Sequence, residues 1–330
     1  MSKILVTGGL GLIGSNICRK LIERGYEVMT FDAEECYSPA LKNNYSKYID
    51  MRFEGIKDKI KIRKGSTVNK DDLRKVMKEF EPERVVHLAG VPVAVSKPED
   101  VEQAVAGNCL GTANLLTVIR ENGGVKRFVY TSTSSVYGDF VTEKPTEEHP
   151  TAPVNEYGAT KLLGEQLTRF AGRRDNLDFV IIRPASVYGP TDLNRRVIQI
   201  FVENAIKGKS IRLNNNGEER LDFTYVEDTA EGFVLATLEP KARNETFNIT
   251  YGESRSLRDL SDILKYHFPD LKVDVVPEEA DVKRPKRGTL DNSKARRILG
   301  FNPKYNLEKG LEKYITFSIS DLKERESGSA

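Results

Sequence analysis

The sequence predicts an α/β fold in which a doubly wound parallel sheet is followed by a smaller C-terminal α/β domain. Short apolar segments rich in branched residues alternate with amphipathic segments along residues 1–184, and this alternation is typical of parallel strands joined by crossover helices. The chain has 330 residues, of which 38% are hydrophobic, enough to bury the cores of two moderate domains. We therefore expect one domain over 1–184 and a second over 185–330, with some later segments returning to the first.

The first strand is predicted at residues 3–6, where "KILV" is continuously apolar. A helix follows from Leu12 to the residue before Gly25, because apolar side chains recur there at helical spacing. The segment "YEVMTFD" then predicts a second strand that ends at Asp32. By the same reasoning, later strands are predicted over 59–65, 84–90, 127–134 and 179–184, and helices over 69–80, 101–122 and 156–171.

A glycine-rich turn, "TGGLGLIGS", joins the first strand to the first helix. Gly8 permits a tight turn, Gly11 lets the backbone approach a pyrophosphate, and Gly14 lets helix and strand pack closely. The helix N-terminus presents free N–H groups to the phosphates. Asp32 stands where a carboxylate binds the adenosine ribose hydroxyls and repels a 2′-phosphate. The pattern predicts a Rossmann-like site for NAD rather than NADP; the alternative is a plain glycine-rich turn.

Two polar segments carry candidate catalytic groups. In "YGATK", Tyr157 and Lys161 lie four residues apart at a helix start, so they share one face. A nearby ammonium and an oxidised nicotinamide favour the phenolate, which can take a proton from a substrate hydroxyl. In "TSTSSVYG", Thr133, assisted by Ser132 or Ser134, is placed to orient the reacting oxygen. The alternatives are a surface Tyr/Lys pair and a strand end whose hydroxyls satisfy their own backbone.

Two further polar residues lie in apolar surroundings. His87 belongs to the buried run "VVHLAG", and we interpret it as structural rather than catalytic. Asn108 lies in a helical segment of otherwise apolar or small residues, and a buried amide needs hydrogen-bond partners. It either braces the catalytic loop or satisfies a neighbouring backbone group.

The charge balance gives no indication of binding to nucleic acid or to acidic membranes. Lysine and arginine number 51 and aspartate and glutamate 49, so the net charge of +2 offers no basic groove for nucleic acid and no attraction to acidic membranes. The apolar run at the N-terminus is too short for a signal-peptide core or a membrane span. Three cysteines without metal-type spacing predict reduced thiols, a cytoplasmic protein and no metal site.

Taken together, the motifs resemble those of the extended short-chain dehydrogenase/reductase family, and most closely its NAD-dependent nucleotide-sugar epimerases and dehydratases, among them the UDP-sugar 4-epimerases. The resemblance extends from about residue 2 to about residue 313. The residues that carry it are "TGGLGLIGS", Asp32, "HLAG", "STSSVYG", "YGATK", "RPASVYGP" and "RLDFTYVED".

The resemblance implies a set of site residues. The catalytic positions of the family match Thr133, Tyr157 and Lys161. The expected NAD contacts are Gly8, Gly11, Leu12, Ile13, Asp32, Leu88, Ala89, Gly90, Asn108, Tyr157, Lys161 and Pro184. The expected substrate contacts are Ser134, Ser186, Arg195, Arg220 and Arg284, where Arg220 and Arg284 are candidates for the pyrophosphate because guanidinium groups match phosphate oxygens.

The same resemblance implies a nucleotide-diphosphate-sugar 4-epimerase that acts through a transient 4-keto sugar. The 4,6-dehydratases of the family carry an Asp–Glu pair where this chain has Ser134 and Ser135, so elimination of water is not expected. Two alternatives stay open: a carbon-4 dehydrogenase or ketoreductase that uses the same residues, and a non-catalytic NAD-binding protein. The family usually dimerises through two helices, so a homodimer is expected. The apolar positions of 101–119 and 161–171 could form this contact, and the alternative is that they only pack on the sheet.

Overall fold

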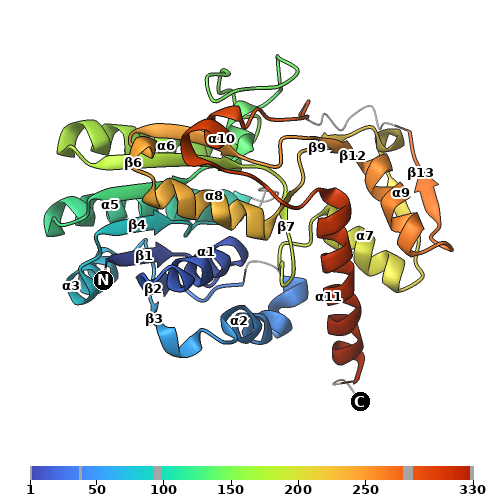
Figure 1. Ribbon diagram of the computed structural model, residues 1–330, viewed down its shortest axis with the longest axis horizontal. Helices are drawn as coiled ribbons and strands as arrows, with labels where there is room; N and C mark the ends of the chain where they lie inside the picture. Colours follow the sequence, from blue (N-terminus) through green and yellow to red (C-terminus); the bar gives the residue numbers. More distant parts are fainter. Residues whose placement is uncertain (1, 37–38, 93–97, 278–284, 328–330) are drawn as a thin grey trace.

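The structure, a computed structural model, describes residues 2–36, 39–92, 98–277 and 285–327. Within these residues, seven parallel strands form the central sheet in the order β11-β6-β5-β4-β1-β2-β3 (Figure 1). The order runs outward from β1 in both directions, which confirms the predicted doubly wound fold. Its strands are β1 (Lys3–Thr7), β2 (Glu27–Asp32), β3 (Ile60–Lys64), β4 (Arg84–His87), β5 (Arg127–Thr131), β6 (Asp178–Pro184) and β11 (Glu245–Ile249).

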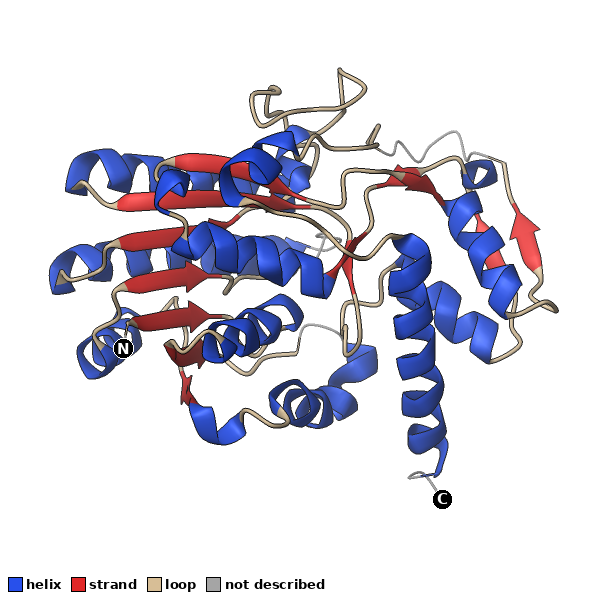
Figure 2. Ribbon diagram, in the orientation of Figure 1, coloured by secondary structure: helices blue, strands red, loops and turns tan. Residues whose placement is uncertain are grey.

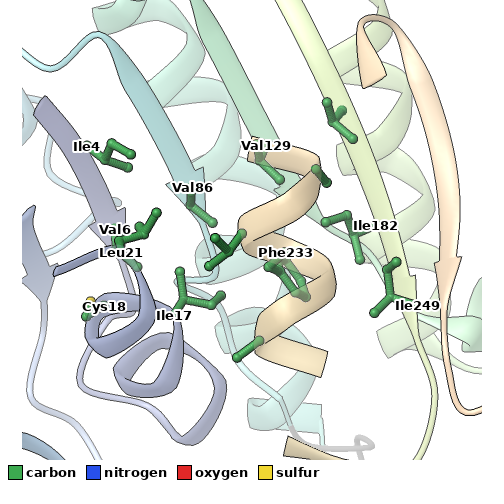
Figure 3. Close-up of a cluster of buried hydrophobic side chains, with 14 of the residues drawn as sticks. Ile4, Val6, Ile17, Cys18, Leu21, Val86, Val129, Ile182, Phe233 and Ile249 are labelled. Carbon is green, nitrogen blue, oxygen red and sulfur yellow. The ribbon is translucent and has the colours of Figure 1, made fainter. Parts of the chain in front are cut away.

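Helices cover both faces of this sheet because its strands are apolar on both sides. On β1, Ile4 and Val6 belong to the core of one face and Leu5 to the core of the other. The first face is covered by α1 (Leu12–Glu23) and α8 (Val226–Leu238), whose Ile17 and Phe233 meet the strands in Figure 3. The opposite face is covered by α3 (Lys70–Phe80), α5 (Gly111–Asn122) and α6 (Glu156–Asp175).

The helix predicted over 101–122 is not continuous. It consists of α4 (Pro98–Ala104), a π-helical turn (Val105–Leu110) and α5. Such a turn inserts an extra residue into the helical ladder and occurs frequently at functional sites. Here it contains Asn108, one of the expected cofactor contacts. A helix absent from the sequence prediction, α2 (Tyr45–Phe53), follows β2.

A second lobe lies beyond the carboxyl ends of the central strands (Figure 2). Its core joins aromatic and aliphatic side chains such as Tyr188, Leu260 and Leu311, separate from the two cores of the sheet. Its helices are α7 (Val197–Ile206), α9 (Leu257–His267) and α11 (Leu307–Ser327), and its short strands are β7 (Val187–Tyr188), β8 (Ile211–Leu213), β9 (Arg220–Leu221), β10 (Thr224–Tyr225), β12 (Arg255–Ser256) and β13 (Val273–Val275).

Not every segment after residue 184 belongs to this lobe. The strand β11 pairs with β6, and α8 lies against the sheet next to α1. The helix α10 (Ser293–Leu299) contributes Ala295 and Leu299 to the same core. The lobe that faces the carboxyl edge of the sheet is therefore assembled from several separate pieces of the C-terminal half.

Candidate functional site

The glycine-rich turn is built so that only glycine fits at its key positions. Gly8 has φ +71°, and a Cβ there would lie 2.6 Å from the backbone nitrogen of Ala89. A Cβ on Gly14 would lie 2.4 Å from the carbonyl oxygen of Gly8. Gly11 precedes α1, and no side chain caps the N–H groups of its first turn. The uncapped turn fits a pyrophosphate, because a helix N-terminus attracts negative charge.

Asp32 stands at the carboxyl end of β2, as expected. Its Oδ2 accepts a hydrogen bond from the backbone N–H of Leu10 at 3.0 Å, and its Oδ1 accepts one from Glu34 at 2.9 Å. Each carboxylate oxygen keeps acceptor capacity for a ribose hydroxyl. Burial raises the pKa of Asp32 above its ordinary value, and the two N–H donors partly offset that rise. Asp32 thus joins the end of β2 to the glycine turn. Leu12 and Ile13 form the first turn of α1.

The end of β4 lies next to β1 and to the π-helical turn. The backbone N–H of Leu88 donates to the carbonyl of Thr7 at 2.9 Å, and Ala89 follows against Gly8. A Cβ on Gly90 would lie 2.4 Å from Oδ1 of Asn108 and 3.7 Å from Nζ of Lys161. The small residues of "HLAG" therefore let this loop pass between the glycine turn and α6.

Asn108 is a brace. Its Oδ1 accepts from the backbone N–H of Val91 at 2.8 Å, and its Nδ2 donates to Oγ1 of Thr160 at 3.1 Å. It therefore ties the loop after β4 to α6, three residues from Tyr157, and also satisfies a backbone group. The sequence left two roles open for Asn108, bracing the catalytic loop and satisfying a neighbouring backbone group, and each role describes part of its contacts.

The three expected catalytic residues meet at the carboxyl edge of the sheet. Thr133 follows β5 and caps a 3₁₀ turn, Ser134–Tyr137. The start of α6 lies against this turn, because a Cβ on Gly158 would be 2.8 Å from the carbonyl oxygen of Ser135. That approach brings Tyr157 beside Thr133, whose hydroxyl acts to lower the pKa of Tyr157. Lys161, one turn further along α6, is buried and donates to the carbonyl of Thr131 at 2.7 Å.

The protein alone holds Tyr157 as a phenol. Burial raises the pKa of Tyr157 above its ordinary value of 10, while the charge of Arg196 and the hydrogen bond with Thr133 act in the opposite direction. Burial lowers the pKa of Lys161 to about 8, and the charges of Cys109 and Glu165 offset that effect in part. The positive side chain that acts on Tyr157 is therefore Arg196. Lys161 stays mostly protonated at neutral pH and loses its charge as the pH rises past 8.

The remaining expected contacts are more scattered. Pro184 ends β6 at the same edge, and Ser186 follows it with a φ of +39°. Ser134 is buried within the 3₁₀ turn. Arg195 is half-exposed and forms an ion pair with Glu203 on α7, 3.5 Å away. Its neighbour Arg196 is the one that acts on Tyr157.

Of the two arginines expected at the pyrophosphate, Arg220 lies on β9 and donates to the carbonyl of Ser254 at 2.7 Å. Half of its side chain is exposed. The prediction for Arg284 concerns a residue outside the described part of the chain.

Arg287 is a site residue that the sequence prediction missed. Its Nη2 lies 3.4 Å from Oγ of Ser135, which also accepts from the Thr133 hydroxyl at 3.3 Å. Burial lowers the pKa of Arg287, and the charges of Glu219 and Asp139 partly oppose that shift. Within the described residues no carboxylate lies within 4.0 Å of its guanidinium group. The signal was present in "KRPKRG", but spacing alone did not distinguish Arg287 from Arg284.

His87 is structural, as interpreted from the sequence. Its Nδ1 lies 2.7 Å from Oγ1 of Thr7, and its Nε2 lies 3.0 Å from Oγ1 of Thr112. Burial lowers the pKa of His87 to about 3, so the ring is neutral. Its contacts join β1, β4 and α5 behind the site.

The described residues contain neither a metal-binding cluster nor a helix that could span a membrane. Across residues 2–36, 39–92, 98–277 and 285–327, no cluster of three or more His, Cys, Asp or Glu side chains is placed to hold a metal ion. In the same residues no helix combines the length and the apolar character needed to cross a bilayer.

Known proteins share this fold along almost the whole chain. The UDP-glucuronic acid 4-epimerase of Bacillus cereus, solved with UDP-glucuronic acid and NAD, has a TM-score of 0.86 and 28% identity, covering 97% of this chain and 99% of that one. A UDP-glucose 4-epimerase of Thermotoga maritima, solved with UDP-glucose, has a TM-score of 0.84 at 28% identity, covering 97% and 99% of the two chains.

The sequence comparisons agree with the structural ones. A UDP-glucose 4-epimerase of Mycolicibacterium smegmatis is 30% identical over 96% of this chain and 98% of its own length. The family described as "NAD dependent epimerase/dehydratase family" matches residues 4–250. With the glycine turn, Asp32 and the Thr133–Tyr157–Lys161 set at one edge of a doubly wound sheet, the chain belongs to the NAD-dependent epimerase/dehydratase family.

Proposed function

We propose that this protein is an NAD-dependent 4-epimerase of a nucleotide-diphosphate sugar. The observation that carries the proposal is the convergence of Thr133, Tyr157 and Lys161 at the carboxyl edge of the sheet, where the start of α6 lies against the 3₁₀ turn and Lys161 is buried one helical turn away. Relatives that align over nearly their whole length are named as UDP-sugar 4-epimerases, which supports it. Ser134 and Ser135 stand where the dehydratases of the family carry carboxylates, so the chain has no acid–base pair there for elimination.

The residues that would hold NAD fall into two groups. The backbone around Gly8 and Gly11 and the first turn of α1, with Leu12 and Ile13, would bind the pyrophosphate, and Asp32 the adenosine ribose. On the far side of β1, we assign the nicotinamide half to the loop after β4, the π-helical turn, α6 and the end of β6: Leu88, Ala89, Gly90, Asn108, Tyr157, Lys161 and Pro184.

In the proposed mechanism, Tyr157 takes the proton from the sugar 4-hydroxyl and later returns it. The Thr133 hydroxyl orients the reacting oxygen, and its hydrogen bond helps to stabilise the phenolate. Because burial alone raises the pKa of Tyr157, nearby positive charge is needed for this step, and Arg196 supplies part of it. NAD bound at these residues would supply a hydride acceptor, and in the return step a hydride donor, for carbon 4 of the sugar.

Substrate recognition is assigned to side chains of the second lobe and of the 3₁₀ turn. Arg287 presents a half-buried cation beside Ser135 without a carboxylate partner in the described residues, so we place an anionic group of the sugar nucleotide there. We retain Ser134 and Ser186 as contacts to the sugar and its phosphates. Arg220 is assigned to the diphosphate, which requires that its side chain turn away from Ser254. Arg195 is also retained as a substrate contact, although it already pairs with Glu203.

A homodimer is part of the proposal. Val105, Leu110, Leu163 and Phe170 expose large apolar side chains, each 47% to 55% exposed, on the π-helical turn and on α6. These are the helices that the sequence predicts as the dimer contact. A cytoplasmic location and a domain boundary near residue 184 are further proposals, with α8, β11 and α10 assigned to the first domain.

The decisive experiment incubates the purified protein, without added cofactor, with UDP-, GDP- and CDP-sugars. Sugar configuration is followed by NMR and reduced nicotinamide by absorbance in the same samples. A new epimer without lasting reduced nicotinamide is expected. Reduced nicotinamide that accumulates with a keto sugar, and no epimer, would instead identify a carbon-4 dehydrogenase. Binding of NAD without any turnover would leave the non-catalytic alternative.

A further inference from the structure

Arg52, near the end of α2, is a buried arginine with no role in the proposed chemistry. Only 7% of its surface is exposed. Its Nη1 donates to the carbonyl of Leu10 at 2.6 Å, and its Nη2 donates to the carbonyl of Thr191 at 2.5 Å. Its Nε donates to Oγ1 of Thr191 at 3.0 Å. One planar guanidinium group thus joins two loops that are 181 residues apart in the chain, the difference between positions 10 and 191.

The first of these loops is the glycine-rich turn. Leu10 lies between Gly8 and Gly11, and its own N–H donates to the Asp32 carboxylate at 3.0 Å. The peptide groups around Leu10 are therefore held on one side by the residue proposed to bind the ribose and on the other by Arg52. Movement of the Arg52 guanidinium would release one side of this turn.

The second loop, residues 189–196, leads from β7 into α7. It contains Thr191, and it ends at Arg196, whose charge acts on Tyr157. Arg52 therefore contacts the loop that carries positive charge to the catalytic tyrosine, and it does so from the cofactor side of the molecule. The chain of contacts runs from Asp32 through Leu10 and Arg52 to Thr191.

The conformation of this second loop is strained. Thr191 has φ +67°, which is rare and energetically unfavourable for a β-branched residue. Such a backbone persists only when its surroundings hold it in place, and it occurs preferentially at functional sites. The two hydrogen bonds from Arg52 to Thr191 supply that restraint directly.

The partners of Arg52 are unusual for a buried cation. Within the described residues no carboxylate lies within 4.0 Å of it, and its hydrogen-bond acceptors are two carbonyls and one hydroxyl. Burial lowers the pKa of Arg52, and the charges of Asp192, Tyr45 and Asp32 partly oppose that shift. Burying a charge without a close counter-ion costs free energy, so the position of this guanidinium group between the two loops indicates a specific role for it.

We propose that Arg52 is a positioning residue that clasps loop 189–196 to the glycine-rich turn and thereby retains the cofactor. The proposal rests on the proposed function, because an epimerase regenerates NAD in every turnover and has no need to release it. Slow release of NAD is then useful, and Arg52 provides it without contacting the reacting atoms. The same clasp keeps the loop that carries Arg196 in register with Tyr157.

The test measures how fast NADH leaves the full-length protein, by stopped-flow fluorescence with excess NAD as competitor. Arg52→Ala is expected to release NADH about 10- to 100-fold faster, since it removes three hydrogen bonds from a charged donor. Arg52→Lys is expected to fall in between, because an ammonium lacks the planar fork that reaches both loops. Steady-state kinetics should show a higher KM for the sugar nucleotide in Arg52→Ala.

Arg19→Ala is the matched control. Arg19 donates to the carbonyls of Arg52 and Glu54, both at 2.9 Å, so it anchors the end of α2 without contacting either loop. It should release NADH at the wild-type rate. If Arg19→Ala accelerates release as much as Arg52→Ala, the effect comes from α2 packing and the proposal fails. It also fails if Arg52→Ala stays within twofold of wild type.

Three further outcomes can be distinguished. If Arg52→Ala does not fold, as judged by circular dichroism, Arg52→Lys against Arg19→Ala decides in the same way. If the wild-type protein does not bind NADH, both the cofactor site and the clasp are wrong. If it binds and releases NADH as described but turns over no sugar nucleotide, the proposed function fails while the clasp stands.

Discussion

The proposed cofactor half and the proposed substrate half of the site are built in different ways. The cofactor half uses backbone: an uncapped helix start, glycines that leave no room for a Cβ, and one carboxylate at a strand end. The substrate half uses long cationic side chains such as Arg287 and Arg196, and backbone held at positive φ, as at Ser186 and Thr191. A backbone site depends on local geometry, whereas a side-chain site depends on distant segments meeting correctly.

The largest expected effect tests the group that stands between the two halves. Tyr157→Phe removes the proton acceptor, so turnover should fall by about 10³- to 10⁴-fold while NADH binding stays within a few fold of wild type. Tyr305→Phe, which removes a hydroxyl bonded to Glu227, is the matched control and should keep its activity. Retained turnover in Tyr157→Phe would assign the proton transfer to another group.

The second prediction challenges the backbone character of the cofactor half. Gly8→Ala and Gly25→Ala both place a Cβ at positive φ, +71° and +80°, but only Gly8 faces a backbone atom within 3.0 Å. Gly25→Ala should cost about 1 kcal/mol of unfolding free energy, and Gly8→Ala roughly 3 kcal/mol or more together with loss of NADH binding. Urea unfolding measures both. Equal losses of unfolding free energy in the two variants would mean that the close approach to Ala89 does not affect stability.

The third prediction concerns Asp222, which holds the substrate half together. Its two carboxylate oxygens accept from the N–H groups of Gly252 and Leu290, and burial raises its pKa to about 7. Because the folded protein binds this proton more tightly than the unfolded chain, its contribution to stability is present below about pH 4. That contribution is lost as the pH rises through 7.

The free energy of unfolding should therefore fall by about 2 kcal/mol between pH 5 and pH 7 on account of Asp222. Asp222→Asn cannot titrate and should flatten this part of the profile, which urea unfolding at several pH values would reveal. An unchanged slope in Asp222→Asn would place the titration in another group.

The smallest expected effect sharpens the side-chain character of the substrate half. Arg287→Gln should raise the KM for the sugar nucleotide about tenfold and leave NADH binding unchanged, because it removes a charge-assisted contact. Arg258→Gln, an exposed arginine on α9 that donates to the carbonyl of Asn216, is the control. Comparing UDP, UDP-glucose and UDP-glucuronate tells a diphosphate contact from a sugar-carboxylate contact. Equal KM values for wild type and Arg287→Gln would remove Arg287 from the site.

Periodicity and glycine spacing predicted most of the first domain correctly, because both report local geometry. The strands that end at Asp32 and Pro184 are found as expected, and so is the helix that begins at Leu12, while the first strand extends one residue beyond its predicted end, to Thr7. The helix over 101–122 was predicted as continuous, but a π-helical turn interrupts it, since nothing in the apolar pattern marks one extra residue. The helix α2 carries a weak amphipathic pattern and was not predicted.

The sequence by itself determined the class of fold and the glycine turn with Asp32, and it selected Thr133, Tyr157 and Lys161 as the proposed catalytic set, because these features lie within short segments whose pattern is local. Only the tertiary structure decided which arginines face the site. Arg287 and Arg196 approach the catalytic residues while Arg195 pairs with Glu203, and Arg52 joins loops 181 positions apart. An arginine side chain is long and flexible, so its place depends on contacts between distant segments, which no local pattern encodes.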